Sequence, residues 1–170
     1  MTDVTLQPVW VIIPAAGVGK RMQLDLPKQY LKINNKTIIE HTLDCFLKHP
    51  DVAGIVVALD SEDPYWKQLQ INTNGKPIYT VEGGKERRDS VMQALDYLNM
   101  VERVDPETWV MVHDAARPCL SQEDINALLE IRGSGCIGGI LASPVRDTMK
   151  RSFSQKNEIS HTESRNDLWH

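Results

Sequence analysis

The residues best suited to phosphate chemistry follow a short apolar run near the start of the chain. Small residues occupy positions 14–19 (Pro-Ala-Ala-Gly-Val-Gly), and the cations Lys20, Arg21 and Lys28 come next. Small residues let the backbone approach a phosphate closely, and successive N–H groups can form a nest that binds an anion. Because cations surround this loop, we predict that the loop and Lys28 form a triphosphate site.

Two familiar phosphate loops do not fit this segment. A Walker A loop has four residues between its glycines and ends in Lys followed by Ser or Thr, whereas a single residue separates Gly17 from Gly19. The dinucleotide fingerprint requires a third glycine, and Met22 stands at that position. A plain tight turn would explain the two glycines alone, but the adjoining cations favour a nucleotide loop.

A second candidate lies at 82–91 (Glu-Gly-Gly-Lys-Glu-Arg-Arg-Asp-Ser-Val), where a predicted strand runs into a predicted helix. Its glycines permit positive φ, and Ser90 on the first helical turn offers a hydroxyl to a base or a phosphate. A glycine turn followed by a solvated, charged helical turn would explain the same residues.

A third candidate, at 113–118 (His-Asp-Ala-Ala-Arg-Pro), follows another predicted strand. Asp114 and Arg117 could simply form an ion pair, but their position at the carboxyl end of a strand favours a functional role. His113 is interpreted as a packed or hydrogen-bonded histidine rather than a catalyst.

The elements that must position these segments alternate along the chain. We predict strands at 9–13, 54–59, 77–81, 109–112 and 139–142, and helices at 37–48, 64–69, 86–98 and 121–131. Apolar strands separated by helices indicate an α/β, Rossmann-like fold, whose mostly parallel twisted sheet carries helices on both faces. Ligands of such sheets bind beyond the carboxyl ends of the strands, where all three candidate segments lie.

The pattern changes at Pro144. Polar, alternating residues at 146–150 and 157–161 flank the turn residues 154–157, so we predict a protruding β-hairpin arm over 144–168 on a single domain spanning 1–170. Two strands alone are marginally stable. Pairing with a second subunit would bury the apolar residues of the arm, and we therefore expect a homodimer.

Composition narrows the possible partners. A chain of 170 residues with a net charge of −4 is unsuited to nucleic acid as its main partner, because the overall field repels a polymer of phosphates. No run approaches the ~20 apolar residues of a membrane span, and no signal peptide is evident. The cysteines Cys45, Cys119 and Cys136 stand far apart, which excludes the usual zinc spacings and fits a cytoplasmic protein.

Together these segments resemble the 2-C-methyl-D-erythritol 4-phosphate cytidylyltransferases of the non-mevalonate isoprenoid pathway. The matching motifs cover nearly the whole chain in order, and their combination is highly specific. They are Pro-Ala-Ala-Gly-x-Gly-x-Arg-Met at 14–22, Pro-Lys-Gln-Tyr-Leu at 27–31, Gly-Gly-x-Glu-Arg-x-x-Ser-Val at 83–91, His-Asp-Ala-Ala-Arg-Pro at 113–118, Pro-Val-x-Asp-Thr-x-Lys at 144–150 and Arg-Asn-x-Leu-Trp at 165–169.

The resemblance implies an enzyme that converts CTP and methylerythritol phosphate to the cytidine diphosphate alcohol and pyrophosphate, with Mg²⁺. It implies that Arg21 and Lys28 stabilise the transition state. The implied nucleotide-binding residues are Ala15, Ala16, Gly17, Gly19, Gly84, Arg87 and Ser90. Those implied on the side of the second substrate are Asp114, Arg117, Thr148 and Arg165, with Arg165 contributed by the partner subunit.

One departure from the family pattern concerns the end of the chain. Members of the family continue beyond the Leu-Trp pair with a segment that includes a lysine for the substrate phosphate and an acidic residue near the metal, whereas this sequence stops at His170. We therefore expect the chain as given to bind CTP weakly and to lack useful turnover. The alternatives are a ribitol-phosphate cytidylyltransferase, which shares the nucleotide-side motifs, and a non-catalytic nucleotide-binding dimer.

Overall fold

The computed structural model describes residues 7–17, 26–154 and 156–170. The chain forms two compact units, which divide between Ala127 and Leu128. The first unit contains the sheet and the three candidate segments that follow its strands, and the second contains the hairpin.

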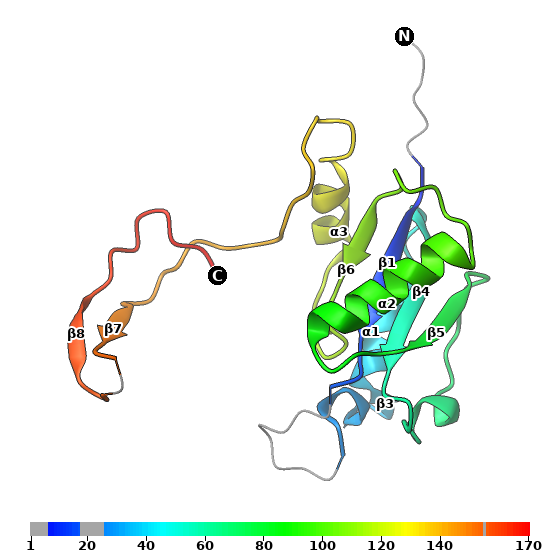
Figure 1. Ribbon diagram of the computed structural model, residues 1–170, viewed down its shortest axis with the longest axis horizontal. Helices are drawn as coiled ribbons and strands as arrows, with labels where there is room; N and C mark the ends of the chain where they lie inside the picture. The colour runs from blue at the N-terminus through cyan, green and yellow to red at the C-terminus, as the bar shows by residue number, and fades with distance from the viewer. Residues whose placement is uncertain (1–6, 18–25, 155) are drawn as a thin grey trace. The chain divides into compact units, whose positions relative to one another are not determined.

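A parallel sheet forms the centre of the first unit (Figure 1). Its strands are β1 (Val9–Pro14), β4 (Val52–Leu59), β5 (Ile78–Glu82) and β6 (Val110–Val112), in the order β5-β4-β1-β6. All three pairings are parallel. Four of the five predicted strands are thereby confirmed, with shifts of one or two residues at their ends.

Helices cover both faces of this sheet, so the predicted Rossmann-like α/β fold is confirmed. In Figure 1, α2 (Arg87–Met100) lies in front of the sheet and α1 (Ile38–Leu47) lies behind it. Ala94 and Leu98 of α2 pack on Ile12 and Val56 in a fully buried cluster. Side chains alternate along a strand, so the neighbours of Ile12 face α1, where Leu43 and Phe46 are also fully buried.

Local signals begin the helices as the sequence predicts. The Thr37 hydroxyl accepts a hydrogen bond from Glu40 N–H, and the Glu40 carboxylate accepts one from Thr37 N–H at 2.8 Å, which closes a capping box at the start of α1. Ser121 and Asp124 make the same exchange at the start of α3 (Gln122–Leu129). The predicted helix at 64–69 is only the short 3₁₀ helix η3 (Trp66–Gln68).

A small hairpin that the sequence analysis did not predict precedes α1. Strands β2 (Lys32–Ile33) and β3 (Lys36–Thr37) pair antiparallel across Asn34 and Asn35, whose φ angles are 51° and 65°. Asparagine tolerates positive φ, and two such residues in succession are typical of a tight hairpin turn. The 3₁₀ helix η2 (Lys28–Tyr30) leads into this hairpin.

The second unit contains the predicted hairpin, and its presence is confirmed. Strands β7 (Lys150–Ser152) and β8 (Ile159–Thr162) pair antiparallel, and all their residues are exposed. The Lys150 ammonium donates to the Thr162 hydroxyl at 2.6 Å, and Arg151 donates to the Glu163 carboxylate at 2.9 Å.

The predicted strand at 139–142 is wrong. In the described structure these residues pair with no strand, and the order of the parallel sheet ends at β6. Ile140 and Leu141 are 84% and 46% exposed. A short apolar run becomes a strand only where a neighbouring strand accepts its backbone hydrogen bonds and other side chains cover it, and these residues have neither.

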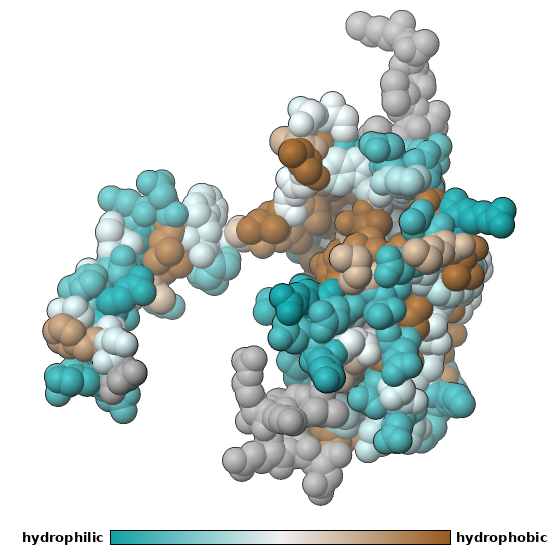
Figure 2. All heavy atoms as spheres, viewed as in Figure 1, coloured by the Kyte–Doolittle hydropathy of each residue, from teal (hydrophilic) through white to brown (hydrophobic). Residues whose placement is uncertain are grey.

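Polar and apolar surfaces separate along α2. Figure 2 shows hydrophilic atoms gathered over the N-terminal end of α2 and hydrophobic atoms near its C-terminal end, where Met100 and Val101 are 72% and 60% exposed.

Among the described residues, no helix has the length and apolar character required to cross a membrane.

Candidate functional site

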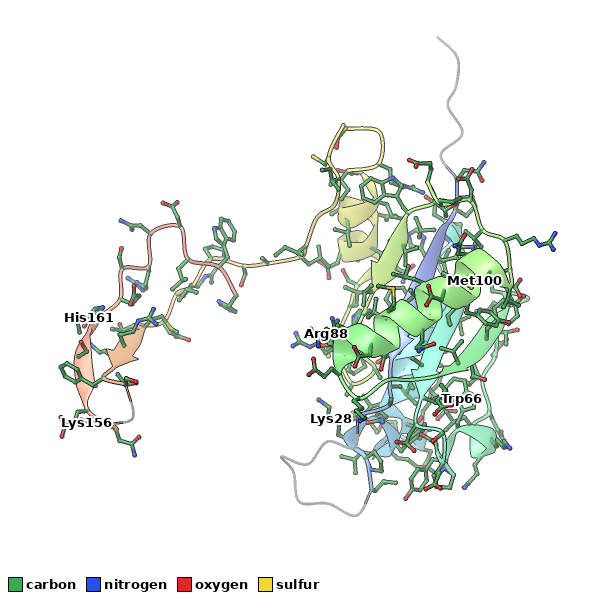
Figure 3. The ribbon with its side chains drawn as sticks, in the orientation of Figure 1. Lys28, Trp66, Arg88, Met100, Lys156 and His161 are labelled. Carbon is green, nitrogen blue, oxygen red and sulfur yellow. The ribbon has the colours of Figure 1, made fainter. Side chains whose placement is uncertain are left out.

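The candidate residues of the first unit gather at one edge of the sheet. Parallel strands end at the same edge, and hydrogen bonds tie the segments beyond their carboxyl ends to the neighbouring strands. Ala15 N–H donates to Ala58 at 2.7 Å, Gly83 N–H to Leu59 at 2.7 Å, and His113 N–H to Ile12 at 3.0 Å. Figure 3 shows Lys28 and Arg88 toward this end of the unit and Met100 at the other end of α2.

The first loop is anchored where it leaves β1. Ala15 is only 4% exposed, and the side-chain amide of Gln29 donates to the carbonyls of Ala15 and Gly17 at 3.0 and 3.5 Å. Of the predicted residues in this loop, Ala15, Ala16 and Gly17 are described. Gly19 and Arg21 lie outside the described residues.

The turn after β5 packs directly on the first loop. A Cβ atom added to Gly83 would lie 2.5 Å from the Cβ of Ala16 and 3.0 Å from the Ser90 hydroxyl oxygen, and one added to Gly84 would lie 2.2 Å from the Cβ of Asp89. No side chain fits at either glycine while its neighbours stay in place. Gly83 is therefore required for the contact between this turn and the first loop, and Gly84 is required for the contact between the turn and Asp89 of α2.

Ser90 holds this turn from the first turn of α2. Its side chain is buried, and its hydroxyl accepts a hydrogen bond from Gly84 N–H at 3.1 Å and donates to the Glu86 carbonyl at 3.4 Å. The sequence analysis interpreted this hydroxyl as a contact for a base or a phosphate. In the structure it fixes the backbone of the glycine turn.

Asp114 joins the second and third candidate segments through two ion pairs. Its carboxylate lies 3.0 Å from Arg87 of α2 and 3.0 Å from Arg117. All three side chains are more than one third exposed, so each pair contributes little to stability, about 1 kcal/mol or less. A guanidinium has more N–H donors than these contacts use. Both arginines can therefore contact an anionic ligand while they hold the carboxylate.

His113 lies beneath this cluster and is packed, as the sequence analysis expected. Its ring meets the edge of Phe46 at a centroid distance of 5.2 Å, and Nδ1–H donates to the Asp114 carbonyl at 3.1 Å. Burial lowers the pKa of His113, and Arg117 and Arg87 lower it further, against an opposing effect of Asp114. The ring therefore stays neutral at neutral pH.

The predicted residues Thr148 and Arg165 belong to the second unit. Both are exposed, and the Arg165 guanidinium donates to the Arg146 carbonyl within that unit. Among the described residues of either unit, no group of three or more His, Cys, Asp or Glu side chains could hold a metal ion.

A cavity of about 520 Å³ lies beside η2. Two of its acidic and phenolic groups are already engaged, because Tyr30 donates to Asp63 at 2.7 Å and Glu40 accepts from Thr37 and Gln70. We assign this cavity no ligand.

Comparisons with known proteins agree with this geometry. Residues 9–170 match the family described as 2-C-methyl-D-erythritol 4-phosphate cytidylyltransferase. The chain belongs to this family. A member from Alteromonas mediterranea is 54% identical over 95% of this chain and 65% of its own length, and one from Vibrio atlanticus is 53% identical over 97% and 68%. The chain thus spans about two thirds of the length of these relatives.

Solved structures of cytidylyltransferases of this family share the fold. A crystal structure of a 4-diphosphocytidyl-2C-methyl-D-erythritol synthase superposes with a TM-score of 0.80 at 34% identity, over 96% of this chain and 71% of that one. The cytidylyltransferase from Francisella tularensis has a TM-score of 0.76 at 37% identity, over 96% and 69%.

Two residues of this candidate site were not singled out individually by the sequence analysis. Gln29 and Gly83 were noted only as members of longer motifs. A glutamine with 3% exposure has no local signature, because its burial depends on contacts 12 and 14 residues away. The need for glycine at 83 depends likewise on Ala16, a residue of another loop.

We predict that Gly83→Ala destabilises the chain by about 1–3 kcal/mol, the usual cost of overpacking. The added methyl group would push Ala16 and the first loop away from the turn. Urea unfolding measures the loss. Gly138→Ala is the control, because a Cβ there meets nothing within 4 Å. Equal stability of the two variants would contradict the close packing of the loops.

We predict that His113 titrates below its ordinary pKa of about 6.5. Since the folded pKa is the lower one, the unfolded chain takes up the proton first. The stability that this residue contributes is therefore complete above about pH 6.5 and is lost as the pH falls below that value. The ring signals in an NMR titration give the midpoint directly.

Urea unfolding at pH 7.5 and pH 5.5 measures the part of the unfolding free energy that His113 contributes. This loss of stability at pH 5.5 should be absent from His113→Phe. It should remain in the control His161→Gln, which changes a histidine of the exposed hairpin. A midpoint for His113 at or above 6.5 would contradict the burial effect.

Proposed function

We propose that this chain carries the nucleotide side of a cytidylyltransferase that forms 4-diphosphocytidyl-2-C-methyl-D-erythritol and pyrophosphate from CTP and 2-C-methyl-D-erythritol 4-phosphate. The observation that carries the proposal is the contact between Ala16 and Gly83, which brings two backbone loops together beyond the carboxyl ends of β1 and β5. The family and the names of its members supply the substrates.

The two loops are suited to a pyrimidine nucleotide. We assign the cytidine part to Ala15, Ala16, Gly17, Gly84 and Ser90, together with Gly19 and Arg87. Backbone N–H and C=O groups can read the edge of a base, and small side chains permit the close approach that this requires. Arg87, at the start of α2, adds a positive charge where the helix dipole also favours an anion.

The reaction needs charge neutralisation more than covalent chemistry. An oxygen of the second substrate's phosphate attacks the α-phosphorus of CTP, and the bond to the departing pyrophosphate breaks on the opposite side. We assign Lys28 and Arg21 to the negative charge on the phosphoryl oxygens in that transition state. Lys28 suits this role, because its side chain is exposed on a turn whose next two residues are buried.

We assign Asp114, Arg117, Thr148 and Arg165 to the second substrate. The Arg87–Asp114–Arg117 cluster offers cations for a phosphate and a carboxylate for hydroxyl groups. For Mg²⁺, the described residues offer no cluster of ligands. A metal that enters with CTP takes most of its ligands from phosphate and water, and this arrangement fits the residues present. Bound there, it would neutralise phosphate charge.

We further propose that the protein acts in the cytoplasm. All three cysteines are free thiols, as a reducing compartment requires.

Pyrophosphate release is the direct test of the proposed function. The chain and a full-length relative are assayed side by side with CTP and methylerythritol phosphate, and separately with CTP and ribitol phosphate. We expect the full-length relative to release pyrophosphate with methylerythritol phosphate and not with ribitol phosphate, and we expect the chain to bind CTP. Activity with ribitol phosphate would replace the proposed substrate. Failure of the chain to bind CTP would remove the nucleotide site.

We predict that replacing Lys28 by Ala in a full-length relative lowers kcat by about 10²–10³-fold, the effect of losing one charge-stabilising donor. The matched control is Lys32→Ala, which removes an exposed lysine from β2 and should leave turnover within twofold. Near-normal turnover without the Lys28 ammonium would remove this residue from the mechanism.

We predict that residues 144–168 form a dimerisation arm. Phe153 and Ile159 of the hairpin are 51% and 64% exposed, and a second subunit would cover them. Sedimentation at tens of micromolar should give a dimer, and Phe153→Ser with Ile159→Ser should give a monomer. Met92→Ser, at a 57% exposed position on α2, is the control. A monomeric unsubstituted chain would contradict the arm.

A further inference from the structure

We propose that Gln29 is a positioning residue that fixes the first nucleotide loop relative to Lys28. The proposal rests on the proposed function for the meaning of these two groups. The structural link itself consists of contacts within the first unit and can be tested without any ligand.

The side chain of Gln29 is a donor placed inside the protein. It is 3% exposed, and its amide nitrogen donates to the carbonyls of Ala15 at 3.0 Å and Gly17 at 3.5 Å. Each hydrogen bond joins parts of the chain that are more than ten residues apart. A side-chain amide nitrogen carries two protons, so one residue satisfies both carbonyls.

The turn that carries Gln29 is held firmly by other contacts. Tyr30 is 3% exposed, donates to the Asp63 carboxylate at 2.7 Å, and packs on Tyr65 with ring centroids 5.0 Å apart. Leu31 accepts a hydrogen bond from Ile38 N–H at 2.9 Å, which joins the turn to the start of α1. Gln29 therefore connects the loop to a rigid support.

The consequence for Lys28 follows from its position. Lys28 and Gln29 are adjacent in η2, and Lys28 is exposed while Gln29 points into the protein. One short turn thus holds the cation on its outer side and the loop carbonyls on its inner side. The separation between the loop backbone and the lysine is set by that turn. Displacement of about 1 Å at a reacting centre can reduce a rate by about two orders of magnitude.

Three substitutions separate this role from a general contribution to folding. Gln29→Ala removes both donors. Gln29→Glu keeps the shape but places an ionised carboxylate against two carbonyl oxygens, and a protonated carboxyl regains one donor. Tyr30→Phe is the matched control, because it removes one partly buried hydrogen bond from the same turn, keeps the aromatic ring that packs on Tyr65, and leaves both loop carbonyls with their donor.

The first measurement uses the chain without nucleotide. Backbone ¹⁵N order parameters of Ala16 and Gly17 should fall below about 0.6 in Gln29→Ala and stay near the unsubstituted value in Tyr30→Phe. In Gln29→Glu they should recover as the pH is lowered and the carboxyl takes up a proton. Unchanged order parameters in Gln29→Ala would overturn the proposal, as would the same loss in Tyr30→Phe.

The second measurement is calorimetric binding of CTP in the presence of excess Mg²⁺. We expect Gln29→Ala to weaken binding at least tenfold and Tyr30→Phe to change it less than twofold. Gln29→Glu should approach the affinity of the unsubstituted chain at low pH, with that chain measured at each pH as the reference. If the unsubstituted chain itself does not bind CTP, the proposed function is wrong. In that case the order parameters alone decide whether Gln29 positions the loop. Loss of loop order in Gln29→Ala with unchanged CTP affinity would show that the link has no role in nucleotide binding and would overturn the proposal.

Discussion

The candidate site depends on the placement of β1 between two parallel neighbours. Val9 to Ile13 are nearly all fully buried, and the strand pairs with β4 on one side and β6 on the other. Because all four strands of this sheet run in the same direction, the segments that follow them leave the sheet at the same edge, and three of these segments carry the candidate residues. The residues of the site come from distant parts of the sequence, and this single constraint brings them together.

At that edge the small residues pack so closely that backbone groups, rather than side chains, line the surface. Gly83 lies against Ala16, and the Ser90 hydroxyl holds Gly84 N–H. Larger residues at these positions would fill the space with side chains and separate the loops. A surface lined by backbone groups is rigid and polar, and it can distinguish a base by its hydrogen-bonding edge. Arg87 and Arg117 pair with Asp114 at the same edge of the sheet, and under the proposed function they and the exposed Lys28 would neutralise phosphates there.

The features that could be predicted from the sequence are those encoded by neighbouring residues. The apolar run at 9–13 and the Thr37–Glu40 capping box carry their own signals, and the structure contains both. The run at 139–142 has the same apolar character, but a strand also needs a neighbour, and the described chain supplies none. The burial of Gln29 and the contact of Gly83 with Ala16 likewise depend on tertiary neighbours, which no local pattern encodes.

The charged cluster has a similar dependence on tertiary structure, with a chemical consequence. Asp114 and Arg117 are three residues apart, so a simple pair was foreseeable, but Arg87 reaches the same carboxylate from α2. The cluster therefore links the helix that follows the glycine turn to the loop that follows β6. A ligand anion that contacts either guanidinium acts on the other through the shared carboxylate. Since these exposed pairs are weak, such a ligand can rearrange them at little cost, while the half-buried ring of His113 packs on Phe46 and donates to the Asp114 carbonyl.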